Sequence, residues 1–310
     1  MTDHETRPQI KPLHPKASGF YKSGLFSNLN KFEELEARIS SLSNDKQKGD
    51  AFEVFAEAYL MTQRRNDAAQ VWPLGSVPLD ILNELNISIM DYGVDGIFKT
   101  QLRGLSAYQV KYRTKRPRLT WTELSTFLGH ADSTSIQCRV LITNCDDLPP
   151  VLIGKERFFC IRGSDLDRLE VKDFHSIEAW LAGAAFELTR KMPLPHQVEA
   201  LSKLLPAFNE SDRISAIMAC GTGKTLVALW VAERIQALKI IILLPSLALI
   251  RQSLHEWLHE TSLPALTYLC VCSDPSVKEG NDSLATNQSD LDFEVTTATQ
   301  NVRDFLDCLW

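Results

Sequence analysis

The chain has 310 residues, a length that accommodates about two domains with separate hydrophobic cores. Hydrophobic residues make up 44% and charged residues 23%, which is the composition of a globular protein and excludes a disordered one. The formal net charge of −6 excludes a protein that is basic overall, but it is compatible with a local basic surface that binds nucleic acid.

No stretch reaches the ~18 consecutive apolar residues that a membrane-spanning helix needs. The first 16 residues lack the apolar core of a signal peptide. The seven cysteines are odd in number and lack paired CxxC spacing, so reduced, structural thiols are expected. A cytoplasmic protein without membrane contact is therefore predicted.

Residues 1–30 contain scattered prolines and polar residues without periodicity, so the sequence predicts a mobile arm there. Apolar residues recur at helical spacing from Phe32 to Leu42, and again from Phe52 to Leu60 after a capping cluster at 43–45. The second of these helices is expected to bury one face, with Glu53 at the edge of that face.

A strand is predicted at 68–72, followed by two strands at 91–100 and 105–112 that are joined by a turn at 102–104. If Gly104 adopts the left-handed conformation in a three-residue loop, Asp95 lies opposite Lys111. Because side chains alternate along a strand, Gln109 and Lys111 share one face, and Gln109 is a diagonal neighbour of Asp95. This hairpin would bring together a carboxylate, an amide oxygen and an ammonium group.

A helix at 121–129, strands at 138–143 and 157–161 and a helix at 176–189 complete the first domain, expected over residues 31–185. A proline-containing linker at 186–195 leads to the second domain, residues 196–310. There a helix from residue 196, a strand before residue 221, a strand at 239–245, a helix at 247–258 and a strand at 266–272 alternate. This alternation predicts an α/β fold with a parallel sheet and helices on both faces.

The second domain contains a glycine loop between a predicted strand and a predicted helix: Gly221, Thr222, Gly223, Lys224 and Thr225. Such a loop turns its backbone N–H groups towards phosphate oxygens, at the positive end of the helix dipole. Lys224 would neutralise the β- and γ-phosphates of ATP, and the Thr225 hydroxyl would bind Mg²⁺. The alternative is an ordinary turn that happens to carry Gly-Lys-Thr.

Met218 stands where the full phosphate-loop signature has a glycine. The run 218–225, Met-Ala-Cys-Gly-Thr-Gly-Lys-Thr, resembles the first motif of superfamily 2 helicases and translocases, especially the motor subunits of type I and type III restriction enzymes. The resemblance implies a RecA-like motor lobe in which Gln197 reads the adenine edge and residues 245–252 contact the DNA backbone. The alternative for Gln197 is a surface position on a helix. No acidic Mg²⁺ motif follows residues 295–297, so an incomplete lobe and a longer parent protein are expected.

Three short runs in the first domain resemble the PD-(D/E)xK nucleases of the Mrr-like branch, in which glutamine replaces the second acid: residues 48–53, 91–96 and 108–111. The resemblance covers roughly residues 45–165 and implies a restriction-endonuclease-like α/β fold. It implies Asp95 as the central metal-binding acid, Gln109 in the variable position and Lys111 as the catalytic lysine. Glu53 matches the further acid of this group and would be a second metal ligand.

The chemistry of phosphodiester hydrolysis also favours these residue types. The reaction needs a hard cation such as Mg²⁺ to polarise the phosphate, and such a cation prefers oxygen ligands. Asp95, the carbonyl of residue 110 and Glu53 could supply them, and Lys111 could orient the attacking water or stabilise the phosphate. The structural alternatives are turn chemistry for Asp95 and the solvated face of an edge strand for Gln109 and Lys111.

Residues 99–118 carry seven basic side chains and no acid, beside three aromatic residues. Such a run would bind a polyanion, or it could form a solvated basic face. The seven are Lys99, Arg103, Lys111, Arg113, Lys115, Arg116 and Arg118.

The combined prediction is an Mrr-like nuclease domain joined to the start of an ATP-dependent motor, acting on double-stranded DNA with ATP and Mg²⁺ as in restriction systems. Other subunits or downstream domains are left open as partners. The rival prediction is a DNA-binding helicase or ATPase whose nuclease-like domain only grips DNA.

Overall fold

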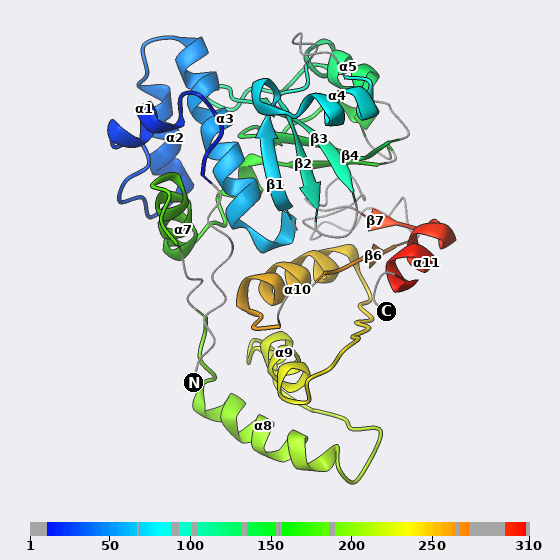
Figure 1. Ribbon diagram of the computed structural model, residues 1–310. Helices are drawn as coiled ribbons and strands as arrows, with labels where there is room; N and C mark the ends of the chain where they lie inside the picture. Colours follow the sequence, from blue (N-terminus) through cyan, green and yellow to red (C-terminus); the bar gives the residue numbers. More distant parts are fainter. Residues whose placement is uncertain are drawn as a thin grey trace. The chain divides into compact units, whose positions relative to one another are not determined.

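The computed structural model describes residues 11–66, 68–87, 93–100, 104–131, 135–152, 155, 157–185, 190–263, 267–272 and 295–307. The chain divides into two compact units, with the divisions between residues 187 and 188 and between 266 and 267 (Figure 1). The fold is mixed α/β, as the sequence predicts at the level of fold class.

The first unit is built on a five-stranded sheet in the order β1-β2-β3-β4-β5. The first three strands are antiparallel neighbours, whereas β4 and β5 each run parallel to the strand before. Because parallel neighbours cannot be joined by a tight turn, the chain crosses from β3 to β4 through α5 (Trp121–His130). The strands are β1 (Ala68–Pro73), β2 (Gly96–Thr100), β3 (Leu105–Lys111), β4 (Ile136–Thr143) and β5 (Phe158–Ile161).

Helices cover both faces of this sheet, and each face has its own hydrophobic core. Residues of α1 (Ala17–Lys22), α2 (Phe32–Ser40), α3 (Asp45–Thr62) and α7 (Val171–Leu181) share one core with alternate strand residues. Residues of α4 (Leu79–Leu85) and α5 share the other. Strand β4 shows the division, because Val140 belongs to the first core and Leu141 to the second.

Helix α3 is the main helix of the first core. The Asn44 side chain accepts the Gln47 backbone N–H at 2.9 Å and so caps its N-terminus. From residue 51 to 62 only Glu53 is not fully buried. The rings of Phe52 and Phe55 stack, and the Tyr59 ring contacts Phe55 in a tilted arrangement. The predicted helices at 30–42 and 45–60 are confirmed as α2 and α3.

Short elements complete the chain. The 3-10 helices span Arg64–Asn66, Leu74–Ser76 and Pro150–Leu152, and α6 spans Gly163–Leu166. The predicted strand at 266–272 is reduced to β6 (Cys270–Val271), which pairs in parallel with β7 (Val295–Thr296) before α11 (Thr299–Asp307). Residues 264–266 lie outside the described residues.

The predicted mobile arm is wrong for residues 11–30, while residues 1–10 lie outside the described residues. This segment forms α1 and buries Leu25, Phe26 and Leu29 in the first core. The Arg38 guanidinium fixes its path by donating hydrogen bonds to three carbonyls at positions 24, 25 and 27, at 3.1, 3.2 and 2.7 Å. The buried residues follow a short helix and turns rather than one period, so the sequence pattern does not reveal them.

The second unit contains α8 (Pro195–Ala207), α9 (Lys224–Arg234) and α10 (Leu247–Glu260), packed around Leu201, Trp230 and Trp257. Its helices agree with the predicted ones. The strands predicted before residue 221 and at 239–245 differ, because no strand is assigned in residues 190–263. An extended segment is stable as a strand only when its N–H and C=O groups are paired.

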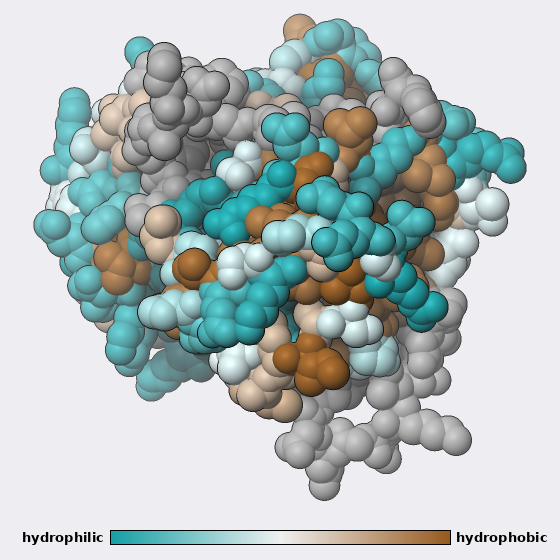
Figure 2. Space-filling model, turned by 90° about the horizontal axis from the view of Figure 1, so that it is seen from below, coloured by the Kyte–Doolittle hydropathy of each residue, from teal (hydrophilic) through white to brown (hydrophobic). Residues whose placement is uncertain are grey.

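Apolar side chains of these two unpaired segments are exposed, including Ile217 at 97% and Leu243 at 88%. Figure 2 shows hydrophobic side chains (brown) at the surface between hydrophilic ones (teal). In no helix of the described residues is an apolar stretch long enough to cross a membrane.

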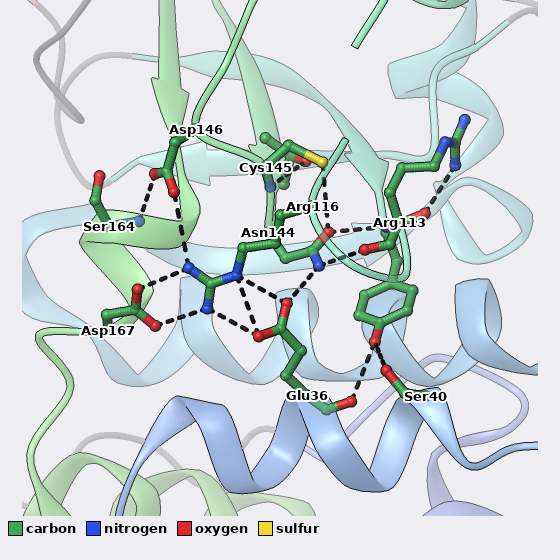
Figure 3. Close-up of polar contacts among 11 residues, drawn as sticks. Glu36, Ser40, Arg113, Arg116, Asn144, Cys145, Asp146, Ser164 and Asp167 are labelled. Carbon is green, nitrogen blue, oxygen red and sulfur yellow. Dashed lines mark hydrogen bonds and ion pairs between the residues drawn. The ribbon is translucent and has the colours of Figure 1, made fainter. Parts of the chain in front are cut away.

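A polar network holds the chain where it leaves β3 (Figure 3). The Arg116 guanidinium donates to both oxygens of Glu36 and both oxygens of Asp167, at 2.7 to 2.9 Å for the four shortest bonds. Glu36 also accepts a hydrogen bond from the Asn144 amide at 2.6 Å. The network therefore joins α2, the segment after β3, the segment after β4 and the end of α6.

Arg116 and its neighbour Lys115 have φ values of 49° and 66°, a left-handed conformation that costs free energy in residues with a side chain. Hydrogen bonds to Asp167, and then to Glu36, raise the pKa of Arg116 above its ordinary value. The ion pairs thus stabilise an unfavourable backbone.

Arg116→Ala is expected to lower the free energy of unfolding by roughly 1 to 3 kcal/mol, because it leaves the partly buried Glu36 carboxylate without its cation and removes the ion pair with the exposed Asp167. Chemical denaturation followed by circular dichroism measures the change. Arg118→Ala is the matched control, since the exposed Arg118 guanidinium makes a long hydrogen bond of 3.4 Å to the Leu148 carbonyl. An equal loss in both variants would contradict the role assigned to Arg116.

Candidate functional site

Asp95 lies immediately before β2 and is fixed against β3 by its backbone and its side chain. Its N–H donates to the Tyr108 carbonyl at 3.0 Å, and its Oδ2 accepts the Val110 N–H at 2.6 Å. A carboxylate held by a backbone N–H of the neighbouring strand has a defined position. Turn chemistry therefore does not explain Asp95.

The observed register corrects the predicted one. The ladder pairs Lys99 with Leu105, and the Thr100 N–H donates to the Gly104 carbonyl, so the loop begins one residue earlier than expected. The ladder ends at the pair Gly96–Tyr108, one residue short of Asp95, so the predicted pairing of Asp95 with Lys111 is wrong. Gln109 and Lys111 share one face of β3, as predicted. Residues 101–103, which contain Arg103, lie outside the described residues.

Gln109 is buried, with 1% of its surface exposed. Strand β3 lies in the centre of the sheet, so the alternative of a solvated edge strand is wrong for Gln109. Its Oε1 has no hydrogen-bond partner among the described residues. A buried oxygen without a donor costs free energy unless a cation or water reaches it.

Lys111 ends β3 and is half-buried. Its ammonium group makes no ion pair or hydrogen bond with the part of the chain that the structure describes. The predicted amide and ammonium groups therefore lie on one face of β3, and the predicted carboxylate is bound to the same strand at Val110.

Two acids of α3 lie beside this hairpin. Glu53, with a side chain 33% exposed, was predicted, whereas Glu57, one helical turn later and fully buried, was not. Burial raises the pKa of the Tyr108 hydroxyl. The charges of Glu57, Asp95 and Glu53 raise this pKa further, in that order, so all three carboxylates lie near the Tyr108 ring.

The Glu57 carboxylate accepts the backbone N–H groups of Leu13 at 2.6 Å and His14 at 3.1 Å. Burial raises the pKa of Glu57 to about 7, although these two hydrogen bonds and His14 lower it. Glu57 could have been predicted from the sequence, because it follows Glu53 by four residues and so lies on the same face of the predicted helix. Within the described residues, no group of three or more His, Cys, Asp or Glu side chains is in place to hold a metal ion.

The basic run at 99–118 is only partly available for a polyanion. Arg113 pairs with Glu123, and Arg116 pairs with Glu36 and Asp167. Burial would raise the pKa of Glu123, but hydrogen bonds from Thr120 and Arg113 lower it to about 2. Acids from other elements thus neutralise part of a run that is purely basic in sequence. Exposed basic side chains remain at Lys99, Lys115 and Arg118.

The glycine loop of the second unit has the conformation that its glycines permit. Gly221 and Gly223 have φ values of 76° and 75°, and Gly223 is the N-cap of α9. The Lys224 ammonium donates to the carbonyls of Met218 at 3.3 Å and Ala219 at 3.0 Å. Thr225 is the second residue of α9, and its carbonyl accepts the Trp257 indole N–H at 2.9 Å.

Gln197 is buried against this loop, with 4% of its surface exposed, so the alternative of a surface position is wrong. Its Nε2 donates to the Thr222 carbonyl at 3.0 Å. A Cβ atom on Gly223 would come within 2.4 Å of that nitrogen. The structure therefore brings all six predicted nucleotide-binding residues together.

Comparison with known proteins supports a restriction-type motor in the second half of the chain. Residues 190–301 match the family described as "Type III restriction enzyme, res subunit". No curated protein matches the chain.

One solved structure with a similar fold is described as "ATP-dependent Type ISP restriction-modification enzyme LlaBIII bound to DNA". The similarity has a TM-score of 0.66 and 24% identity, and it covers 90% of this chain. The chain spans 18% of the length of that enzyme. At this identity the similarity shows a shared fold.

The free energy of unfolding should fall by about 3 kcal/mol more in the natural protein than in Glu57→Gln as pH rises from 4.5 to 7. The folded state keeps the Glu57 proton that the unfolded state loses, so rising pH favours unfolding. Denaturation at a series of pH values measures the difference. The contributions of the other acids to the free energy of unfolding cancel, because they are the same in the two proteins. The same slope in both would show that Glu57 does not titrate in this window.

Proposed function

We infer that this chain combines a Mg²⁺-dependent DNA endonuclease with the ATP-binding part of a motor that moves along duplex DNA, as in an ATP-dependent restriction enzyme. The observation that carries the nuclease half is that Gln109 and Lys111 share one face of β3, the strand that holds the Asp95 carboxylate, and that the buried amide oxygen of Gln109 lacks a donor. The match of residues 190–301 carries the motor half.

The order of elements in the first unit supports the nuclease half. A helix bearing an acid (α3) precedes three antiparallel strands, a crossover helix (α5) and a parallel strand (β4). This order resembles the PD-(D/E)xK fold, in which the central acid begins the second strand and the lysine ends the third. In this chain Asp95 comes immediately before β2 and Lys111 ends β3, which supports the proposal.

The residues fit a hard divalent cation. The unsatisfied Oε1 of Gln109, the carboxylate of Asp95 and the half-exposed carboxylate of Glu53 are all oxygen donors. Bound Mg²⁺ would polarise the scissile phosphate and lower the pKa of a bound water. The chain's own contribution would be to supply these oxygens from the residue before β2, from β3 and from α3, while the charge of Lys111 at the end of β3 would stabilise the extra negative charge of the attacked phosphate.

The glycine loop fits the phosphates of ATP. Gly221 and Gly223 let the backbone turn its N–H groups to the N-terminus of α9, where an anion is stabilised. A phosphate would replace the two carbonyls that now accept the Lys224 ammonium. Thr225 would bind Mg²⁺, and Gln197 is held beside the loop to contact the base.

The second candidate function is a DNA-binding ATPase whose nuclease-like domain only grips DNA. The observation that favours it is that no three acidic, histidine or cysteine side chains form a ready metal cluster in the described residues. Metal-dependent cleavage separates the two candidates.

Asp95→Asn or Lys111→Ala should reduce Mg²⁺-dependent cleavage of duplex DNA at least a hundredfold, because each removes a charge at the reacting phosphate. Cleavage of supercoiled plasmid by the full chain measures this rate. Lys22→Ala, which changes an exposed lysine on α1 outside the basic run at 99–118, should cut at the natural rate. Cleavage that persists in Asp95→Asn would contradict the nuclease assignment.

Lys224→Ala should weaken ATP binding at least tenfold, because a positive charge at the β- and γ-phosphates is lost while the exposed side chain leaves no cavity. Calorimetric titration with ATP is the measurement. Lys203→Ala is the control, since Lys203 pairs with Glu199 on the surface of α8. Equal ATP affinity in the natural protein and Lys224→Ala would overturn the phosphate-loop assignment.

A further inference from the structure

The segment before α1 lies along the acidic face of α3. We define the N-terminal strap as residues 13–16, which contact acids on successive turns of the helix. The N–H groups of Leu13 and His14 donate to Glu57, the His14 ring meets Glu53, and the Lys16 ammonium lies 3.9 Å from Asp50. The strap therefore runs antiparallel to α3.

The strap is also attached on the hairpin side. The Ser76 hydroxyl donates to the Leu13 carbonyl at 3.2 Å, and the nearby Leu74 N–H donates to the Asp95 carbonyl at 2.8 Å. The strap thus connects the helix that carries Glu53 to the segment that lies beside Asp95.

The hydrogen bonds of His14 define which nitrogen faces Glu53. The Lys16 N–H donates to Nδ1 at 3.2 Å, so Nδ1 is an acceptor and the proton of the neutral ring lies on Nε2. Nε2 is 3.3 Å from Glu53 Oε2 and donates to it. The His14 side chain is 7% exposed, whereas that of Glu53 is 33% exposed. A buried donor therefore holds one oxygen of a carboxylate whose other oxygen is available.

We propose that His14 is a positioning residue for Glu53, fixing its carboxylate so that the other oxygen faces the divalent cation of the nuclease site. This inference rests on the proposed function. A carboxylate that swings freely loses more rotamer entropy on binding a cation than one already held by a hydrogen bond. Mutation of a residue that hydrogen-bonds to a metal ligand typically weakens metal binding by about 10- to 100-fold.

Two substitutions separate positioning from a structural role. His14→Gln places an amide N–H near the position of Nε2, where it can still donate to Glu53. His14→Asn offers an acceptor to the Lys16 N–H, as Nδ1 does, but is too short to reach Glu53. Both are polar and smaller than or similar to histidine, so the strap keeps its place in each.

Two measurements on the full chain are compared: the dissociation constant for Mn²⁺ by calorimetry, and the Mg²⁺ concentration that gives half-maximal cleavage. His14→Asn should raise both about tenfold, and His14→Gln should stay within about threefold of the natural protein. The unfolding temperature is measured for each variant. Lys16→Ala, which loosens the strap at Asp50 only, should leave both values unchanged.

Unchanged metal affinity in His14→Asn would overturn the proposal. An equal loss of metal affinity in His14→Asn and His14→Gln would also overturn it, because that pattern indicates a role in strap packing alone. Failure of the proposed function gives a different result. In that case the natural protein neither binds Mn²⁺ nor cuts DNA, and Glu53→Ala changes nothing.

Discussion

The pairing of β2 with β3 is the constraint on which the candidate nuclease site depends. The Val110 N–H donates to the Asp95 carboxylate and so fixes it against β3, the strand that carries Gln109 and Lys111 on one face. A slip of one residue would turn the side chains of one strand to the other face. The register is protected at Gly96, where any Cβ atom would come within 2.4 Å of the Tyr108 ring and hydroxyl.

Helix α3 supplies the other half of the site and shows how burial and charge are combined there. Glu57 is buried and held by two backbone N–H groups, while Glu53 remains partly exposed one turn earlier. The same segment that satisfies Glu57 brings His14 to Glu53. Glu57 thus determines where the N-terminal strap lies. The strap in turn provides His14 as the hydrogen-bond partner of Glu53.

Local periodicity and glycine positions predicted much of this molecule. Helices α2, α3, α5, α8 and α10 follow from apolar spacing, and the gathering of Gln197 with the glycine loop follows from motif order. Features that depend on distant residues could not be predicted. The acids that neutralise Arg116 come from α2 and from the end of α6, and the predicted strands at 239–245 and before residue 221 lack partner strands in the described residues.

The central claim is that the Oε1 atom of Gln109, which lacks a hydrogen-bond donor among the described residues, belongs to a metal site. It is tested by measuring how much Mn²⁺ stabilises variants at Gln109. A cation that binds only the folded state raises the unfolding temperature. Gln109→Glu should unfold earlier than the natural protein without Mn²⁺ and gain more with it, because a buried carboxylate needs a cation. Gln109→Leu should gain nothing. An equal gain in Gln109→Leu and the natural protein would contradict the account.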